Sequence, residues 1–256
     1  MSSDSRMPFV AHLRELRGCL VRALLGIFLF SGAALYWASE LFALLILPLK
    51  RSGEAFTLIG TGPADAFIAK LNVAIVAGLI LSLPFTFYQL WKFIAPGLHE
   101  HEKKLALPFV ASATFAFISG AAFCYQVVFP FAFRFFLQEY QSIETEASLR
   151  INDYLSFVLK MILIFGTVFE LPVLCFILAR FGLVSSSWLL KKGRWIIVGS
   201  FVAAAVFTPP DVLSQLLLAA PLLLIYGICI LVTYFWGTAE VSRHQDTSEQ
   251  NEDLAL

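Results

Sequence analysis

Charged residues are scarce in this chain. Only 14% of its 256 residues are Asp, Glu, Lys or Arg, and 59% are apolar, whereas a soluble domain has about 25% charged residues. The 18 basic and 18 acidic residues cancel, so no positive excess favours binding of nucleic acid. A soluble fold of this size has no core large enough for so much apolar surface. The composition therefore predicts a membrane protein.

Residues that carry metal, redox or hydrolytic chemistry are also few. The four cysteines are far apart without a C-x-x-C pair, so we interpret them as small buried apolar side chains. All four histidines lie outside the apolar stretches, which argues against haem ligation or a Ser–His hydrolase inside the bilayer. His99 and His101 alternate with glutamates but lack a third ligand. No nucleotide-binding glycine motif is present. We expect no metal, no cofactor and no enzymatic activity.

Long uncharged stretches predict six membrane-spanning helices. The expected spans are residues 23–45, 71–92, 106–134, 154–180, 195–208 and 212–236, within a membrane domain at 23–237. A cytoplasmic amphipathic helix is expected at 1–22, and a disordered polar tail at 238–256. The predicted fold class is an all-α integral membrane protein with six transmembrane helices, the last two short, packed as a concave bundle.

The distribution of Lys and Arg predicts that both termini are cytoplasmic. Twelve of the 18 lie before the first expected span, after the second and fourth, or in the tail, and five lie in the other loops. Cytoplasmic loops carry the excess of Lys and Arg. The remaining one, Lys160, falls near the outer end of the fourth span.

Five prolines predict turns or kinks. Pro209 and Pro210 cannot continue a helix, so they divide the last apolar block into a hairpin of two helices. Pro96 belongs to a Pro-Gly turn between the second and third spans. Pro172 is expected to kink the fourth span, and Pro48 to mark a turn at the end of the first.

Three polar side chains fall within or beside the expected spans. A carboxylate at the position of Glu170 costs at least roughly 2.5–3.5 kcal/mol on insertion scales, so Glu170 is either a functional site or a protonated group bonded within the bundle. Asp211 is placed to cap the last helix. Gln215, one turn further on, is placed to bond a neighbouring helix.

Six short strings occur in a fixed order and carry a resemblance. They are HLRELR at 12–17, YQLWKFIAP at 88–96, HEKK at 101–104, YLSF at 154–157, FELP at 169–172 and TPPDVLSQ at 208–215. Together they resemble the TatC family, the core subunit of the twin-arginine protein translocase, over residues 9–235.

Glu15 lies within the first of these strings and interrupts a set of arginines. Without the resemblance, the simplest interpretation of Glu15 is a solvated acid that pairs with a nearby Arg or Lys.

The resemblance implies a non-enzymatic receptor in the cytoplasmic (inner) membrane that is driven by the proton motive force. Its signal-peptide-binding residues would be Glu15, Glu102, Arg17 and Phe93. Guanidinium groups match carboxylates in shape and charge, so two acids can hold two consecutive arginines. The implied partners are twin-arginine signal peptides of folded cargo, single-span subunits of the TatA and TatB type, other copies of the chain, and membrane lipids. The alternative is an ion-coupled secondary transporter of a small solute with Glu170 as coupling group, although the inverted repeats typical of that class are not evident.

Overall fold

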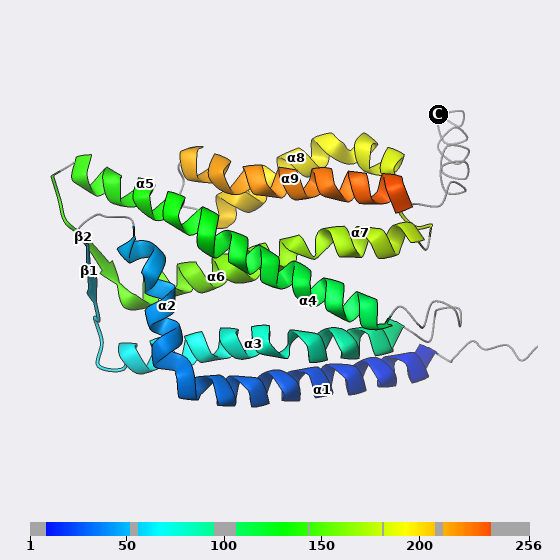
Figure 1. The fold of residues 1–256 in the computed structure, drawn as a ribbon, viewed down its shortest axis with the longest axis horizontal. Helices are drawn as coiled ribbons and strands as arrows, with labels where there is room; N and C mark the ends of the chain where they lie inside the picture. Colours follow the sequence, from blue (N-terminus) through cyan, green and yellow to red (C-terminus); the bar gives the residue numbers. More distant parts are fainter. Residues whose placement is uncertain are drawn as a thin grey trace, which may run out of the picture.

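Long helices that run side by side make up most of the structure, a computed structural model (Figure 1). It describes residues 9–51, 56–94, 106–142, 144–180, 182–207 and 212–236. The elements are α1 (Phe9–Ala34), η1 (Leu35–Trp37), α2 (Ala38–Lys50), β1 (Phe56–Ile59), α3 (Asp65–Ile94), α4 (Ala106–Phe123), η4 (Cys124–Val128), α5 (Phe129–Ser142), β2 (Ala147–Arg150), α6 (Ile151–Phe169), α7 (Leu171–Arg180), α8 (Ser186–Phe207) and α9 (Val212–Trp236).

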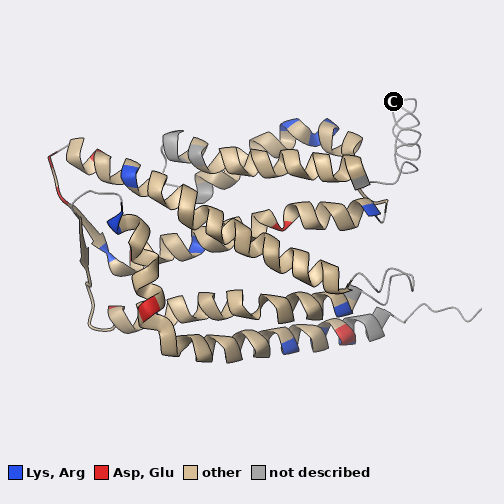
Figure 2. Ribbon diagram, in the orientation of Figure 1, with Lys and Arg blue, Asp and Glu red and all other residues tan. Residues whose placement is uncertain are grey.

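The two ends of the bundle differ. The start of α1 and the end of α9 lie at the same end, together with the end of α3 and the start of α4; we call this the terminal end (Figure 1). The opposite end carries β1 and β2, and we call it the strand end. Charged residues are sparse along the helices between these ends (Figure 2).

Five helical segments in the described part of the chain are long and apolar enough to cross a membrane. They are Arg14–Lys50, Ala106–Ser142, Ile151–Arg180 and Leu218–Phe235, with the bent pair Asp65–Leu81 and Leu83–Phe93 as the fifth. They correspond to five of the six expected spans. The remaining one falls in α8, whose first half contains Lys191, Lys192 and Arg194.

Three expectations about helix length need correction. The final helix is not short, because α9 has 25 residues, about 37 Å at 1.5 Å per residue. α8 has 22 residues and begins at Ser186 instead of residue 195, since its basic first turns are helical although they are not apolar. α1 runs without a break through residues 22 and 23, where a surface helix was expected to give way to the first span.

Small residues bring α1 and α3 into close contact. Ala34 and Ala74 are fully buried where the two helices meet. A Cβ atom added to Gly78 would overlap the backbone of Ser31. Small side chains at such positions let membrane helices pack backbone to backbone, so Gly78 fixes the spacing of this helix pair.

A proline bends α3. Its two halves differ in direction by 52° around Ser82, and Pro84 lies inside the helix. Proline has no N–H for the carbonyl four residues earlier, which kinks a helix. The hydroxyl of Ser82 donates to the carbonyl of Leu79 over 2.8 Å. The expected span 71–92 lies within α3, and its bend was not predicted from the sequence.

Two tyrosines support the proline in α2. Pro48 leaves the carbonyl of Leu44 without the usual backbone donor. The hydroxyl of Tyr125 donates to that carbonyl over 2.8 Å, and the hydroxyl of Tyr154 donates to the carbonyl of Leu45 over 2.8 Å. Tyr125 belongs to η4, a π-helical turn between α4 and α5. Pro48, which was expected to mark a turn, is therefore a buried residue inside a helix.

The all-α prediction needs one addition. β1 and β2 form a two-stranded parallel sheet in which Phe56 pairs with Ala147 and Ile59 with Arg150. Both strands lie in segments expected to be outer loops. The sheet ties the segment before α3 to the segment before α6, and strand pairing over this sequence separation leaves no local hydropathy signal.

Candidate functional site

Glu15 lies near the start of α1, which is at the terminal end (Figure 1). Its side chain is half-buried, and Arg17 beside it is exposed. Within the described residues Glu15 has no ion-pair partner. Arg22, on the same helix, is hydrogen-bonded to other residues. Its Nε donates to Oε1 of Gln89 over 3.1 Å, and its Nη2 donates to Sγ of Cys19 over 3.3 Å. The carboxylate of Glu15 is thus not neutralised by the local arginines that the sequence placed around it.

The Arg22–Gln89 bond fixes the register of α1 against α3. Gln89 is buried, and Phe93, half-buried, follows it by one turn toward the end of α3. Glu15 precedes Arg22 by two turns, about 10 Å along the axis. Because the helices are antiparallel (Figure 1), Glu15 and Phe93 both lie beyond this bond, at the terminal end.

Glu102 and Pro96 lie outside the described residues. They belong to the segment between Ile94, the last residue of α3, and Ala106, the first residue of α4. Both of these helix ends lie at the terminal end (Figure 1). The segment that carries Glu102 therefore leaves and rejoins the bundle at the end where Glu15 lies.

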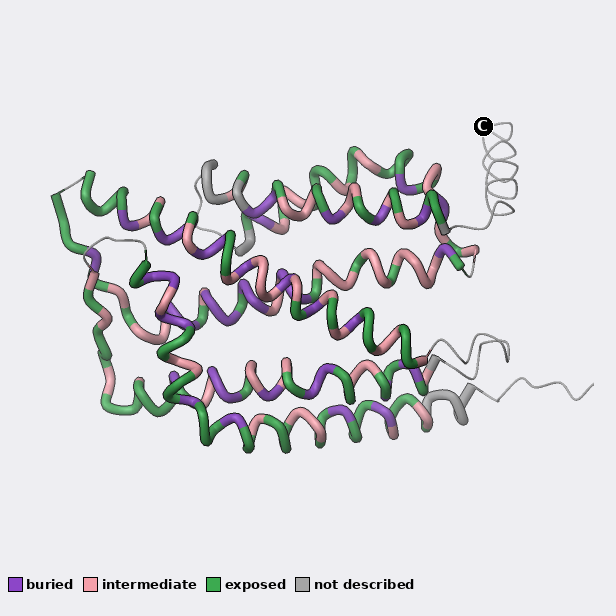
Figure 3. The backbone as a smooth tube through the Cα atoms, viewed as in Figure 1, coloured by how far each residue is buried: buried purple, intermediate pink, exposed green. Residues whose placement is uncertain are grey.

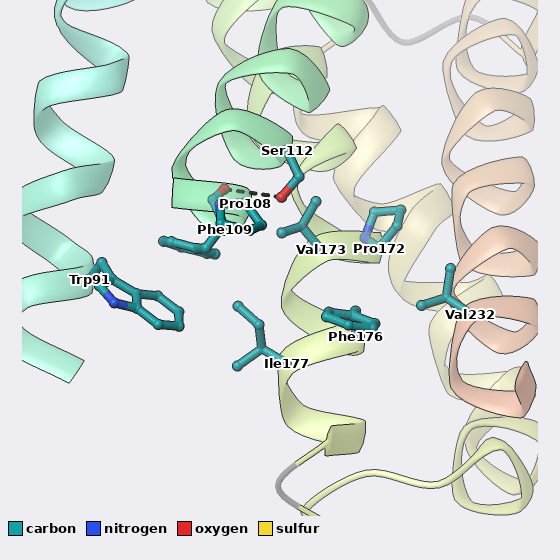
Figure 4. A pocket seen from close by; sticks show the side chains of 9 residues that line it. All are labelled: Trp91, Pro108, Phe109, Ser112, Pro172, Val173, Phe176, Ile177 and Val232. Atoms are coloured by element: carbon teal, nitrogen blue, oxygen red, sulfur yellow. Dashed lines mark hydrogen bonds between the residues drawn. The ribbon is translucent and has the colours of Figure 1, made fainter. Parts of the chain in front are cut away.

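An apolar cavity of about 470 Å³ opens beside these residues (Figure 4). It lies between α3, α4, α7 and α9. The rings of Trp91 and Phe109 are 4.9 Å apart and form one wall, and side chains of α7 face them across the space. Its lining comprises Trp91, Pro108, Phe109, Ser112, Pro172, Val173, Phe176, Ile177 and Val232. Sequence reasoning missed this cavity, because its residues come from four separated helices and all except Ser112 are ordinary apolar span residues.

Glu170 marks the break between α6 and α7. Its N–H donates to the carbonyl of Thr167 over 3.1 Å instead of continuing the α-helical pattern. Pro172, two residues later, has no N–H with which to continue it. The helix is therefore interrupted at Glu170, between Phe169 and Leu171.

The carboxylate of Glu170 is poorly satisfied. Its Oε1 atom is buried without a hydrogen-bond partner among the described residues, and the carboxylate reaches the backbone of Phe117 in α4. An unpartnered buried polar atom is costly and is expected to face a partner or a cavity when it lies within a membrane.

Gln215 joins the last two helices. Its Nε2 donates to the carbonyl of Phe201 in α8 over 3.0 Å. The hydroxyl of Tyr226 makes a similar bond of 2.7 Å to the carbonyl of Leu189. α8 and α9 are thus held to each other at two levels. Asp211, Pro209 and Pro210 fall between these helices and lie outside the described residues.

Metal ligands do not cluster in the described residues, where no group of three or more His, Cys, Asp or Glu side chains is close enough to hold an ion. His99 and His101 lie outside that part of the chain. We therefore derive no metal chemistry for this site.

Comparison with known proteins confirms the family resemblance. The family model for "Sec-independent protein translocase protein (TatC)" matches residues 11–221. The chain belongs to the TatC family. A TatC relative from Azotobacter chroococcum is 42% identical over 230 residues, which cover 88% of this chain and 89% of the relative. The Escherichia coli K12 TatC is 37% identical over 237 residues, which cover 92% of each chain.

Solved structures of TatC share this fold. A crystal structure described as the twin arginine translocase receptor TatC has a TM-score of 0.78 and 34% identity, over 87% of this chain and 97% of that chain. A second, in the detergent DDM, has a TM-score of 0.79 and 35% identity, over 87% and 99%. Membership of the TatC family places the chain among multi-pass membrane proteins that serve Sec-independent protein transport.

Proposed function

We propose that this chain is the receptor subunit of a twin-arginine translocase in the inner membrane. It binds signal peptides with two consecutive arginines at its cytoplasmic face and organises the transport of folded proteins, driven by the proton motive force. The role is binding and positioning, without catalysis. The observation that carries the proposal is the carboxylate of Glu15, which has no ion-pair partner among the described residues and lies at the end of the bundle where α3 ends and α4 begins.

Arginine recognition follows from the charges at this end. Each carboxylate accepts two parallel N–H bonds from one guanidinium, and such charge-assisted bonds are worth about 1.5–3 kcal/mol each. Lysine offers no such planar fork. Arg17 is exposed near Glu15 and repels unpaired cations, so that a basic segment binds only when both of its arginines are matched.

The apolar stretch that follows the arginines enters the aromatic cavity. Trp91 lines this cavity two residues before Phe93 on α3, so the cavity begins next to the arginine site. Its walls are almost entirely apolar (Figure 4), which suits a hydrophobic peptide segment. Phe93 then lies between the charged and apolar parts of the signal.

The proposed topology has six spans with both termini in the cytoplasm. The first and last described helix ends lie together (Figure 1), as an even number of crossings requires. The Lys and Arg distribution assigns the terminal end to the cytoplasm. α8 supplies the sixth span through its apolar second half, and the whole forms a concave bundle.

The proposed partners beside the signal peptide are TatA and TatB type single-span helices, further copies of this chain and membrane lipids. Gln215 and Asp211 lie at the α8–α9 connection, where Gln215 already makes an interhelical bond. Its carbonyl oxygen is a further acceptor for a polar group on a docking helix. Glu170 is the intramembrane polar site.

Signal-peptide capture tests the arginine assignment. The full chain in detergent is offered an immobilised twin-arginine peptide and its Lys-Lys variant. Binding is expected for the first alone, and Glu15→Gln and Glu102→Gln are each expected to weaken it by tenfold or more, since each removes about 1.5 kcal/mol or more. Glu40→Gln, an exposed acid on α2 away from this end, is the matched control. Equal binding by all three variants would refute the assignment.

A further inference from the structure

The exposed face of α6 differs in composition from the exposed face of α1. Every exposed residue of α6 is polar: Asp153, Ser156, Lys160 and Thr167. On α1, by contrast, the exposed side chains include a long apolar series such as Leu25 and Phe28. Figure 3 shows exposed positions recurring along both helices. The chemistry of the exposed face therefore differs between two helices of the same bundle.

The four polar residues form one stripe. Their spacing of 3, 4 and 7 residues places them within about 60° on a helix of 3.6 residues per turn. The opposite face carries the buried residues Leu155, Val158 and Phe165 of the main core, and packs against α3 and α4. From Asp153 to Thr167 the stripe is about 21 Å long, which is more than half of the hydrocarbon thickness of roughly 30 Å.

Both ends of the stripe meet further polar features. Asp153 lines a cavity of about 370 Å³ at the strand end, which also contains Glu139 and Tyr140. Thr167 lies one turn before Glu170, whose buried Oε1 lacks a hydrogen-bond partner in the described structure. The stripe thus leads from two acidic side chains at the rim of a mainly apolar cavity to the unpartnered Oε1 atom of Glu170.

Lys160 makes contact of this face with lipid tails costly. It is exposed within the candidate span Ile151–Arg180 and has no ion-pair partner among the described residues. A cation in a membrane helix usually faces a water-filled space or a partner. The Lys side chain leans toward the start of its helix, and Ser156 and Asp153 keep that direction polar.

We propose that this stripe lines a hydrated lane, a water-filled path that opens at the strand end and gives water access toward Glu170. Its wall is the face of α6 from Asp153 to Thr167, on which Lys160 is the one exposed cation and Asp153 the one exposed acid. The inference stands apart from signal binding, because no residue of the arginine site takes part in it.

Accessibility of introduced thiols tests the lane. In the full chain with its four native cysteines replaced by alanine, Ser156→Cys, Lys160→Cys and Thr167→Cys are made singly in proteoliposomes. Leu25→Cys and Phe28→Cys on α1 serve as lipid-facing controls. Membrane-impermeant thiosulfonates are added; the thiolate attacks the reagent sulfur, a mixed disulfide forms and methanesulfinate leaves. Labelling of all three stripe positions at least tenfold faster than both controls is expected.

Charge preference tests the part assigned to Lys160. At position 156, one turn from both Asp153 and Lys160, the rates of an anionic and a cationic thiosulfonate of similar size are measured as a ratio. Lys160→Gln should lower this anionic-to-cationic ratio roughly fivefold, in keeping with a unit charge about 6–10 Å away. Lys70→Gln, an exposed lysine on α3, should leave it unchanged.

Two results would overturn the proposal. Labelling of Thr167→Cys at the rate of the α1 controls would show that lipid or another protein covers the stripe. An unchanged ratio of the two rates in Lys160→Gln would show that Lys160 does not face the lane. Gel-filtration profiles matching the parent protein establish that each variant is folded.

Discussion

The hydroxyl of Tyr125 donates a 2.8 Å hydrogen bond to the carbonyl of Leu44. That carbonyl lies four residues before Pro48, which has no N–H to offer it. A side chain from the π-helical turn η4 thus supplies the hydrogen bond that the proline removes from α2. Pro48 and Tyr125 therefore form one structural unit.

Tyr125→Phe is expected to lower the free energy of unfolding by about 1–2 kcal/mol, because the carbonyl of Leu44 loses its partner. Tyr140→Phe, on the exposed part of α5, is the control and should change it by less than about 0.5 kcal/mol. Unfolding of the purified protein with SDS in mixed micelles measures both. Equal stability of the two variants would contradict the role given to Tyr125.

Gly78→Ala is expected to destabilise the protein by at least about 1–3 kcal/mol, because the new methyl group overlaps the backbone of Ser31. Gly32 on α1 has open space at its Cβ position, so Gly32→Ala should be neutral or stabilise by up to about 1 kcal/mol. The difference between these two variants in thermal melting isolates the helix contact from the intrinsic helix propensity of alanine.

Glu170→Leu is expected to raise stability and abolish transport. Replacing an unpartnered buried polar group with an apolar one removes its desolvation cost, and the Oε1 atom of Glu170 has no partner among the described residues. Binding of the twin-arginine peptide should persist, since Glu170 lies apart from Glu15. Thermal melting, peptide capture and an export assay are measured together. Full export by this variant would rule out a functional role for the carboxylate.

Gln215→Leu is expected to weaken crosslinking to single-span TatA and TatB type subunits, because it removes both the bond to the carbonyl of Phe201 and the free acceptor. Gln126→Leu, an exposed glutamine in η4, has no such bond among those described and serves as the control. If both variants crosslink equally well, Gln215 does not mark the docking site.

Local patterns predicted the helices well and their irregularities poorly. The expected span 212–236 has the bounds of α9, and 154–180 spans α6 and α7 apart from the first three residues of α6, since a membrane span needs continuous apolar sequence. α3 begins six residues before the expected start at 71. Pro172 predicted a kink in the fourth span, and the helix is interrupted two residues earlier, at Glu170. The bend near Ser82 was not predicted, although Pro84 was a usable signal.

Features formed between distant segments had no readable signal. The π-helical turn, the parallel pairing of β1 with β2 and the aromatic cavity each depend on which helices become neighbours. Trp91 and Phe109 give no indication of a shared wall until α3 and α4 are packed together. The roles proposed for Glu15 and Gln215 came from the family resemblance. The polar stripe of α6, by contrast, could be recognised only from the exposure of its residues in the structure.

The strand pairing also constrains how the chain matures at the membrane. Thr57 meets Ser148, which lies 91 residues later. A ribosome making the chain from its N-terminus must therefore add and insert two further helical spans before β1 finds its neighbour. Until then the first half of the chain lacks the pairing of β1 with β2. Release of the nascent chain before β2 has emerged would leave an intermediate in which β1 has no partner strand, and we expect such an intermediate to be a substrate for quality-control proteases.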